Sequence, residues 1–245
     1  MSVVALVPAA GRGERLGGSV PKALVPVGGE PLLAYAVRGL HSSGCIDRVV
    51  VAAPPSHLDL MVDVLARAGV EAVLVAGGPS RTQSVRLALD AAGADATVVL
   101  VHDAARAFTP AEVIRAVVAA VEAGAQAVIP VLPVADTLKR VDPAGVVVDT
   151  PNRAELRIAQ TPQGFAADVL RRAYAAYPED STTDDAGLVE RLGVPVSTVP
   201  GHPNALKITT PFDLAIAEAL LATCGPYVAF SATKGPHVAS PGEPR

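Results

Sequence analysis

A glycine-rich loop follows the first apolar run of the chain. Residues 8–17 read Pro-Ala-Ala-Gly-Arg-Gly-Glu-Arg-Leu-Gly, and Pro21 and Lys22 come shortly after. Glycines at the end of a strand let backbone N–H groups approach the phosphates of a ligand closely. Arg15 and Lys22 beside such a loop would stabilise the charge that grows during phosphoryl or nucleotidyl transfer. The alternative is that both cations are solvated loop residues, which are common.

This loop matches neither of two well-known glycine-rich nucleotide motifs. The dinucleotide fingerprint requires Gly-x-Gly-x-x-Gly, but the third glycine, Gly17, comes one residue late. The second apolar run, Val49–Ala53, also ends without an acidic residue for a ribose. A P-loop requires Lys followed by Ser or Thr directly after Gly18, where Ser19 stands instead. The loop therefore predicts a different kind of phosphate site.

A second candidate site follows another apolar run, where residues 102–106 read His-Asp-Ala-Ala-Arg. An Asp at the carboxyl end of a strand in an open α/β sheet faces the ligand crevice. Mg²⁺ is usually held by one or two carboxylates together with substrate phosphates, so Asp103 is a candidate metal ligand. The alternative is an ion pair with Arg106 that shapes the turn. We expect His102 to be a packed residue at the strand end rather than a base.

Two further clusters carry residues of the same kind. The segment Gly77–Ser84 again places glycines and hydroxyls between an expected strand and an expected helix. Lys207 lies among neutral residues before another helix. An ordinary capped turn is the structural alternative for the first cluster, and a surface lysine is the alternative for the second.

The hydrophobic pattern predicts the scaffold that would bring these segments together. Continuous β-branched runs, typical of strands buried on both faces, alternate with helical stretches. The expected strands are Val3–Val7, Val49–Ala53, Ala72–Val75, Val98–Val101, Ala127–Val131 and Val194–Val199. The expected helices are Pro31–Leu40, His57–Ala68, Thr82–Ala91, Pro110–Ala123, Ala166–Tyr177, Asp184–Leu192 and Pro211–Ala222. This order predicts an α/β fold with a mostly parallel, doubly wound sheet and right-handed crossovers.

Local signals predict where some helices begin and end. Thr109 is the expected N-cap of a helix whose first residue is Pro110, with Glu112 three residues after the cap. Gly69 and Gly124 follow helices at the position of a left-handed C-cap.

The alternation is interrupted after Val131. Val134–Arg140 and Val146–Thr150, joined by Asp-Pro-Ala-Gly, predict an antiparallel hairpin inserted in the sheet. From Gly225 onward the chain is rich in Pro, Gly and Ser and has no period. We therefore expect one domain over residues 1–224, an inserted arm at about 134–155, and a flexible tail over 225–245.

Composition excludes several classes of protein. Half of the 245 residues are hydrophobic, 18% are charged and the net charge is −4, which argues against general disorder and against a basic nucleic-acid binder. No run reaches the roughly 18 apolar residues of a membrane helix, and the N-terminus lacks the basic region of a signal peptide. Cys45 and Cys224 lie far apart, outside metal-ligand spacing. We expect a cytoplasmic enzyme without nucleic-acid or membrane partners.

An ordered set of motifs extends over residues 3–222. It comprises Pro8-Ala9-Ala10-Gly11-x-Gly13-x-Arg15, Pro21-Lys22, Gly77-Gly78-x-x-Arg81-x-x-Ser84-Val85, His102-Asp103-Ala104-Ala105-Arg106, Asp136-Thr137-Leu138-Lys139, Arg153, Gln160-Thr161-Pro162-Gln163-x-Phe165, Thr183-Asp184 and Lys207-Ile208-Thr209. In these motifs the chain resembles the 2-C-methyl-D-erythritol 4-phosphate cytidylyltransferase family of the non-mevalonate isoprenoid pathway. It departs from the family pattern at Ala107, usually Pro, and at Ala23, commonly Gln.

The resemblance implies a Rossmann-like nucleotidyltransferase fold and a homodimer in which the hairpin arm of one subunit reaches the site of the other. It implies a reaction between CTP and 2-C-methyl-D-erythritol 4-phosphate that yields 4-diphosphocytidyl-2-C-methyl-D-erythritol and pyrophosphate. The implied cofactor is Mg²⁺ or another divalent cation. The nucleophile of such a reaction is an anionic phosphate oxygen, so catalysis needs positioning and charge neutralisation rather than a general base.

The resemblance also implies roles for individual residues. The implied catalytic residues are Arg15, Lys22, Arg153 and Lys207. The implied nucleotide-binding residues are Ala9, Ala10, Gly11, Gly13, Gly78, Arg81, Ser84 and Asp103, with Asp103 also beside the metal. The implied residues for the sugar phosphate are Asp103, Arg106, Thr137, Arg153, Thr161, Thr183 and Lys207.

Two other functions remain open at this point. A cytidylyltransferase for another polyol phosphate, such as ribitol 5-phosphate, shares most of the glycine-loop and Asp-Ala-Ala-Arg signals. A non-catalytic nucleotide-binding domain could keep the same fold, although Arg15, Lys22, Asp103 and Lys207 all have the residue types that a catalyst needs.

Overall fold

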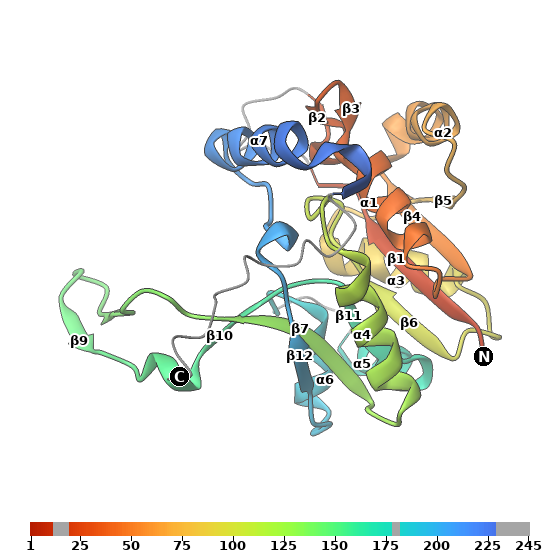
Figure 1. Ribbon diagram of the computed structural model, residues 1–245. Helices are drawn as coiled ribbons and strands as arrows, with labels where there is room; N and C mark the ends of the chain where they lie inside the picture. The colour runs from red at the N-terminus through yellow and green to blue at the C-terminus, as the bar shows by residue number, and fades with distance from the viewer. Residues whose placement is uncertain (12–19, 178–181, 229–245) are drawn as a thin grey trace, which may run out of the picture.

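One central sheet organises the molecule. The computed structural model describes residues 1–11, 20–177 and 182–228. Within them an eight-stranded sheet has the order β10-β7-β11-β6-β1-β4-β5, and β12 pairs with the other edge of β7 (Figure 1). Six of its strands are mutually parallel: β1 (Val3–Pro8), β4 (Arg48–Ala53), β5 (Val73–Ala76), β6 (Val98–Val101), β7 (Ala127–Pro133) and β12 (Ser197–Pro200). The predicted α/β fold with a mostly parallel sheet is confirmed.

Two strands run antiparallel to the others and are absent from the sequence-based expectations. They are β10 (Arg157–Ala159) and β11 (Gln163–Ala166). β11 lies between β6 and β7, and β10 continues along the same edge of β7. They are only three and four residues long, and Ile158 is their single β-branched residue, so their extended conformation is set by the strands beside them. The strand expected at Val194–Val199 is also shorter than predicted, since β12 begins only at Ser197.

Helices cover both faces of the sheet and divide the core into two clusters. Val3, Ala5 and Val7 of β1 face one cluster, whereas Val4 and Leu6 face the other, which explains the continuous apolar run in the sequence. The first face is covered by α1 (Leu32–Ser42), α2 (Leu58–Arg67) and α4 (Ala111–Glu122). The second face is covered by α3 (Arg81–Ala91), α5 (Ala167–Ala176) and α6 (Asp185–Arg191).

Two predicted C-terminal helix ends, at Gly69 and Gly124, are confirmed, whereas the predicted N-cap at Thr109 is wrong. Gly69 and Gly124 have φ angles of 65° and 107°, the left-handed conformation expected after a helix. At the start of α4, however, the N-cap is Pro110, and it makes no side-chain capping bond. The Thr109 hydroxyl instead donates to the carbonyl of Arg106 at 3.0 Å. It therefore stabilises the preceding turn rather than the helix.

The inserted hairpin forms an arm that projects from the body (Figure 1). Its strands, β8 (Arg140–Val141) and β9 (Val147–Asp149), are shorter than the predicted Val134–Arg140 and Val146–Thr150. Residues 134–139 have no partner strand in the described chain. No ladder of hydrogen bonds forms there, and the arm strands are therefore short. The turn between β8 and β9 is held by the Asp142 carboxylate, which accepts from the amides of Ala144 and Val146 at 2.9 Å.

The last helix, α7 (Pro211–Val228), extends past the expected boundary between domain and tail. The predicted helix end at Ala222 is wrong, since the helix continues to Val228. The remainder of the expected tail, residues 229–245, lies outside the described residues. α7 packs through Leu214, Ala217 and Leu221 on a third cluster, together with the small hairpin of β2 (Pro26–Val27) and β3 (Glu30–Pro31).

Among the helices of the described residues, none combines the length and apolar character that crossing a membrane demands.

Candidate active site

A cavity of about 1240 Å³ opens at the carboxyl ends of β1, β4, β5 and β6. Ligands of open α/β sheets bind at this edge, because the loops that follow parallel strands converge there. The walls come from separate segments of sequence, which contribute residues 8–11, 20–23, 54–57, 77–84 in part, 103–105, and 207 with 209. The cavity thus brings together all four clusters that the sequence singled out.

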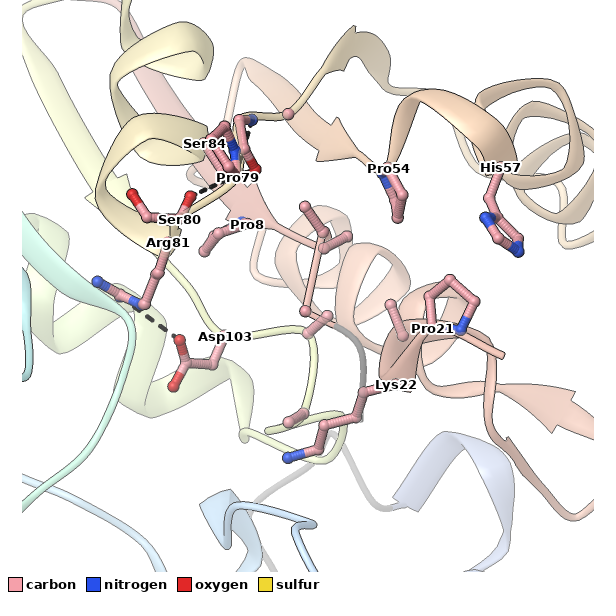
Figure 2. A pocket seen from close by; sticks show the side chains of 18 of the residues that line it. Pro8, Pro21, Lys22, Pro54, His57, Pro79, Ser80, Arg81, Ser84 and Asp103 are labelled. Atoms are coloured by element: carbon pink, nitrogen blue, oxygen red, sulfur yellow. Dashed lines mark hydrogen bonds and ion pairs between the residues drawn. The ribbon is translucent and has the colours of Figure 1, made fainter. Parts of the chain in front are cut away.

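Lys22 reaches this cavity because the ends of the glycine loop are fixed. The Ala9 amide donates to the Ala52 carbonyl at 2.8 Å, and the Lys22 amide donates to the Gly11 carbonyl at 3.1 Å. Lys22 begins the short helix η2 (Lys22–Leu24), whose other two residues are buried. Figure 2 shows the side chains of Lys22 and Asp103 extending into the same cavity.

Gly77 and Gly78 form the opposite wall, where larger residues would not fit. A Cβ atom on Gly77 would lie 2.9 Å from the Cβ of Ala10 and 3.2 Å from the carbonyl oxygen of Ala53. A Cβ atom on Gly78 would lie 2.5 Å from the Cβ of Gln83. The contacts of 2.9 and 2.5 Å are too close for real side chains, so glycine at 77 allows the approach to Ala10 and glycine at 78 allows the close turn onto Gln83.

The start of α3 fixes the position of Arg81. Ser80 is the N-cap, and its hydroxyl oxygen accepts from the Gln83 amide at 3.1 Å. The Ser84 hydroxyl accepts from the Gly78 amide at 3.1 Å and lies 2.9 Å from the Ser80 carbonyl, to which it donates. The turn at residues 77–84 is therefore both a capped helix start and part of the cavity wall. Its interpretation as an ordinary capped turn does not exclude a part in ligand binding.

Asp103 lies among three cations that come from distant parts of the chain. Its carboxylate is 2.8 Å from Nζ of Lys207, 3.5 Å from Nη2 of Arg81 and 4.0 Å from Nε of Arg106. Burial alone would raise the pKa of Asp103, but the charges of Arg81, Lys207 and Arg106 outweigh it and hold the pKa well below its ordinary value. Arg81 also pairs with Asp185 at 2.7 Å, so two carboxylates face three cations, and the excess positive charge attracts an anion to the edge of the cavity.

Lys207 is held in place by the start of α7. The amide of Ile208, the next residue, donates to the Ala105 carbonyl at 2.9 Å. The carboxylate of Asp213 accepts from the amides of Thr209 and Thr210 at 2.8 Å, while the Asp213 amide donates to the Thr210 hydroxyl at 3.2 Å. This reciprocal capping box orients the loop, and it lowers the pKa of Asp213 to about 2, chiefly through the hydrogen bond from the Thr209 hydroxyl.

A second, smaller cavity of about 190 Å³ adjoins the first. Arg81, Asp103 and Lys207 line both cavities, so the charged cluster stands at their junction. The remaining walls of the smaller cavity are residues 106, 159–161, 163, 183 and 184. Arg106 is largely committed to the fold there, because it donates to the carbonyls of Ala205 at 2.7 Å and Ala159 at 3.2 Å.

His102 and Thr161 form a buried link beneath Asp103. The Thr161 hydroxyl oxygen accepts from the Asp103 amide at 3.0 Å and lies 3.1 Å from Nδ1 of His102. A neutral imidazole has one N–H, so the tautomer decides which atom of the His102–Thr161 pair donates. His102 is a packed residue at the strand end, as predicted.

We expect His102 to make the stability of the protein depend on pH. Burial lowers the pKa of His102 to about 4, whereas its ordinary value is 6.5. Between these values the unfolded chain binds more protons than the folded one, so stability falls as the pH drops through this window, by on the order of 3 kcal/mol. Urea unfolding from pH 7 to pH 4 should show a weaker pH dependence for His102→Leu. Identical pH dependence in both proteins would contradict the assignment.

Of four further candidate residues, two lie outside the described part of the chain and two lie on the arm. Gly13 and Arg15 are the two outside the described residues. Thr137 and Arg153 are exposed on the arm, and neither lines the larger or the smaller of the two cavities. The guanidinium of Arg153, in η4 (Arg153–Glu155), donates to the carbonyl of Ala135 within the arm.

Two buried polar residues that shape this site have no role among the sequence-based expectations, although one of them, Gln163, belongs to a motif of the resemblance. Gln163 donates to the Asp184 carboxylate at 2.8 Å and accepts from the Ala186 amide at 3.0 Å, which fixes the loop that carries Thr183. Asp185 is 1% exposed and pairs with Arg81 at 2.7 Å. The acidic doublet at 184–185 was the available signal, but nothing in the sequence tells which member caps the helix and which is buried.

Asp103 fits the role of a single protein ligand to a metal ion. No group of three or more His, Cys, Asp or Glu side chains in the described part of the chain is placed to hold a metal together. A hard carboxylate at a phosphate-binding cavity is what Mg²⁺ takes from a protein when phosphates supply further oxygens. The site therefore suits a divalent cation that arrives with a phosphate ligand.

Comparison with known proteins finds close relatives over nearly the whole chain. The family model described as 2-C-methyl-D-erythritol 4-phosphate cytidylyltransferase matches residues 3–223. Proteins of that name from Saccharopolyspora erythraea and Nocardia farcinica are 67% and 58% identical to this chain; the alignments cover 91% and 90% of it, and 100% and 94% of the relatives. The crystal structure of 2-C-methyl-D-erythritol 4-phosphate cytidylyltransferase from Thermus thermophilus is similar with a TM-score of 0.73 and 37% identity, over 91% of this chain and 100% of that one.

Proposed function

The chain belongs to the 2-C-methyl-D-erythritol 4-phosphate cytidylyltransferase family, and on this basis we propose that it transfers the cytidylyl group of CTP to 2-C-methyl-D-erythritol 4-phosphate. A phosphate oxygen of the sugar alcohol attacks the α-phosphorus of CTP. The bond from that phosphorus to the oxygen bridging the α- and β-phosphates breaks, and pyrophosphate leaves. The products are 4-diphosphocytidyl-2-C-methyl-D-erythritol and pyrophosphate, in the non-mevalonate isoprenoid pathway.

The junction of the two cavities is the observation that carries this proposal. The larger cavity has the glycine-lined walls and the volume for a nucleotide, and the smaller one has room for a sugar phosphate. Arg81, Asp103 and Lys207 stand between them, where two phosphate groups would meet. Cations fixed at that point oppose the repulsion between two anionic substrates and stabilise the charge that develops at the α-phosphate.

We include Mg²⁺ in the proposal, with Asp103 as its ligand from the protein. Bound with the triphosphate, the cation would neutralise charge on the leaving pyrophosphate. Lys22 and Lys207 would contribute fixed positive charge from the protein itself. A cytoplasmic location is also part of the proposal, because the nucleotide substrate is a cytoplasmic metabolite.

A homodimer would complete the smaller cavity. Val141, Val146, Val147 and Val148 of the arm are each more than half exposed, an apolar surface that is unfavourable in water. An isolated two-stranded hairpin is marginal in water, so such an arm needs a surface to rest on. We propose that it packs on a second subunit and brings Arg153 and Thr137 to the sugar-phosphate site of that subunit.

The central test is the release of pyrophosphate from CTP, measured with each sugar phosphate in turn. We expect release with 2-C-methyl-D-erythritol 4-phosphate and at least about tenfold less with ATP or GTP, roughly 1.4 kcal/mol of differential binding. The reason is that the family resemblance assigns the walls at residues 9–11 and 78–84 to cytosine, a base smaller than a purine. Preference for ribitol 5-phosphate would identify the related polyol enzyme. No release with any sugar phosphate would favour a non-catalytic domain, and equal turnover of purines would contradict the assigned pocket.

A further inference from the structure

A buried carboxylate lies directly behind the junction of the two cavities. Asp185, the first residue of α6, is 1% exposed and lines neither cavity. One of its carboxylate oxygens accepts from Nη2 of Arg81 at 2.7 Å, and the other accepts from the hydroxyl of Tyr174 on α5. Removing a carboxylate from water is costly unless it is paired and hydrogen-bonded, and here both oxygens have partners. Its position is therefore specified by Arg81 and Tyr174 together.

Arg81 is divided between two acids. Its Nη2 atom lies 2.7 Å from Asp185 but 3.5 Å from Asp103, so the buried acid holds it more closely. Burial alone would lower the pKa of Arg81, but the charges of Asp185 and Asp103 reverse this and raise it, so the guanidinium stays charged. Asp103 is left with Lys207 at 2.8 Å as its nearest cation.

This arrangement leaves part of the guanidinium directed toward the junction. Arginine presents five N–H donors in a rigid, planar fork, which matches the oxygens of a phosphate. The side-chain hydrogen bonds of Arg81 to other described residues all use Nη2, and about a third of the side chain is exposed where it lines both cavities. Figure 2 shows Arg81 at the cavity wall beside Asp103.

We propose that Asp185, supported by Tyr174, is a positioning residue that holds Arg81 so that its remaining N–H groups bind a phosphate oxygen where the two substrates meet. The inference rests on the proposed function, since that function puts phosphates at the junction. Without the buried charge, Arg81 would move toward Asp103 and compete with Lys207 for it. Asp185 thus keeps the cations at the junction apart, and it acts on the substrates only through Arg81.

A double-mutant cycle tests this role. In the pyrophosphate-release assay, Asp185→Asn should lower kcat/KM by about 10- to 100-fold, as expected when a binding group loses its orienting partner. The double variant Asp185→Asn/Arg81→Ala should have the same kcat/KM as Arg81→Ala alone, because Asp185 acts on the substrates only through the side chain of Arg81. The proposal would be overturned if the two substitutions together lowered kcat/KM by the product of their separate effects. It would also be overturned if kcat/KM of the Asp185→Asn enzyme lay within twofold of the wild-type value.

Matched variants separate this role from a general loss of structure. Asp95→Asn breaks a similar Arg–Asp pair, with Arg48, on an exposed part of the surface and should leave kcat/KM unchanged. Tyr174→Phe should lower kcat/KM about threefold to tenfold, whereas Tyr177→Phe, at the end of the same helix, should not. If Asp185→Asn does not fold, the tyrosine pair decides the matter, and equal rates for Tyr174→Phe and Tyr177→Phe would overturn the proposal.

Calorimetric binding of CTP and of the sugar phosphate gives a readout that does not depend on turnover. Asp185→Asn should weaken at least one of the two by about tenfold, and the affected ligand identifies whose phosphate Arg81 contacts. If the wild-type protein binds both ligands but releases no pyrophosphate, the proposed function is refuted and the positioning role is not. Unaltered affinity of Asp185→Asn for both ligands would refute the positioning role alone.

Discussion

Lys22→Ala should lower kcat by about 10²- to 10³-fold, the typical cost of removing one fixed group that stabilises developing charge. The reason is the place of its ammonium group, in the cavity wall at the carboxyl end of β1. The backbone hydrogen bonds at this point, from the Lys22 amide to Gly11 and from the Val25 amide to the Lys22 carbonyl, remain possible in the variant, so we expect η2 to keep its place. Steady-state kinetics with CTP and methylerythritol phosphate provide the measurement.

Two substitutions at the same position separate charge from shape. Lys22→Gln keeps most of the length of the side chain without its charge and should be nearly as slow as Lys22→Ala. Lys22→Arg keeps the charge and should recover part of the rate, though not all, because a planar guanidinium does not reproduce a compact ammonium group. A Lys22→Ala enzyme with nearly normal kcat would return this residue to the class of solvated loop cations.

Mixing two inactive variants should restore activity if the arm serves a neighbouring subunit. Arg153 is on the arm, away from the cavities of its own chain, whereas Lys22 lines the cavity of its own chain. In a mixture of Arg153→Ala and Lys22→Ala subunits, random pairing makes half of the dimers mixed, and each mixed dimer has one fully intact site. About a quarter of all sites would then be active.

The mixing experiment needs subunits that exchange. Activity should rise after joint incubation or joint refolding, and each variant alone should remain inactive under the same treatment. Mixing Lys22→Ala with Lys207→Ala, both altered in cavity residues of one chain, should restore nothing. A strictly monomeric protein, or mixed dimers without regained activity, would contradict the shared site.

Much of the scaffold was predictable because its signals are local. The β-branched runs that become β1, β4 and β6 are apolar at every position, since successive side chains enter cores on opposite faces of the sheet. Gly69 and Gly124 mark helix ends because a left-handed backbone excludes most other residues. Asp103 could be placed at the ligand edge from its position after a strand alone.

Other parts of the fold depend on contacts that a sequence does not display. β11 is extended because it fits between β6 and β7, although its four residues include no β-branched side chain and give no strand pattern. α7 is placed by Leu214, Ala217 and Leu221, which pack on the cluster that includes Val27, a contact between distant parts of the chain, like the bond from the Gly28 amide to Glu218. The arm strands are shorter than predicted because no neighbouring strand extends their ladder.

By itself, the sequence determined the chemistry available to this protein: a glycine loop, two lysines, an Asp and several arginines with the types and order of a phosphate-transfer site. Only the tertiary structure decided how those charges pair. Arg81, Asp103, Asp185 and Lys207 meet at one point because parallel strands end at the same edge of the sheet, and α6 and the loop before α7 lie beside it. Pairing energies depend on burial and on distances of a few ångströms, which residue type and spacing along the chain do not specify.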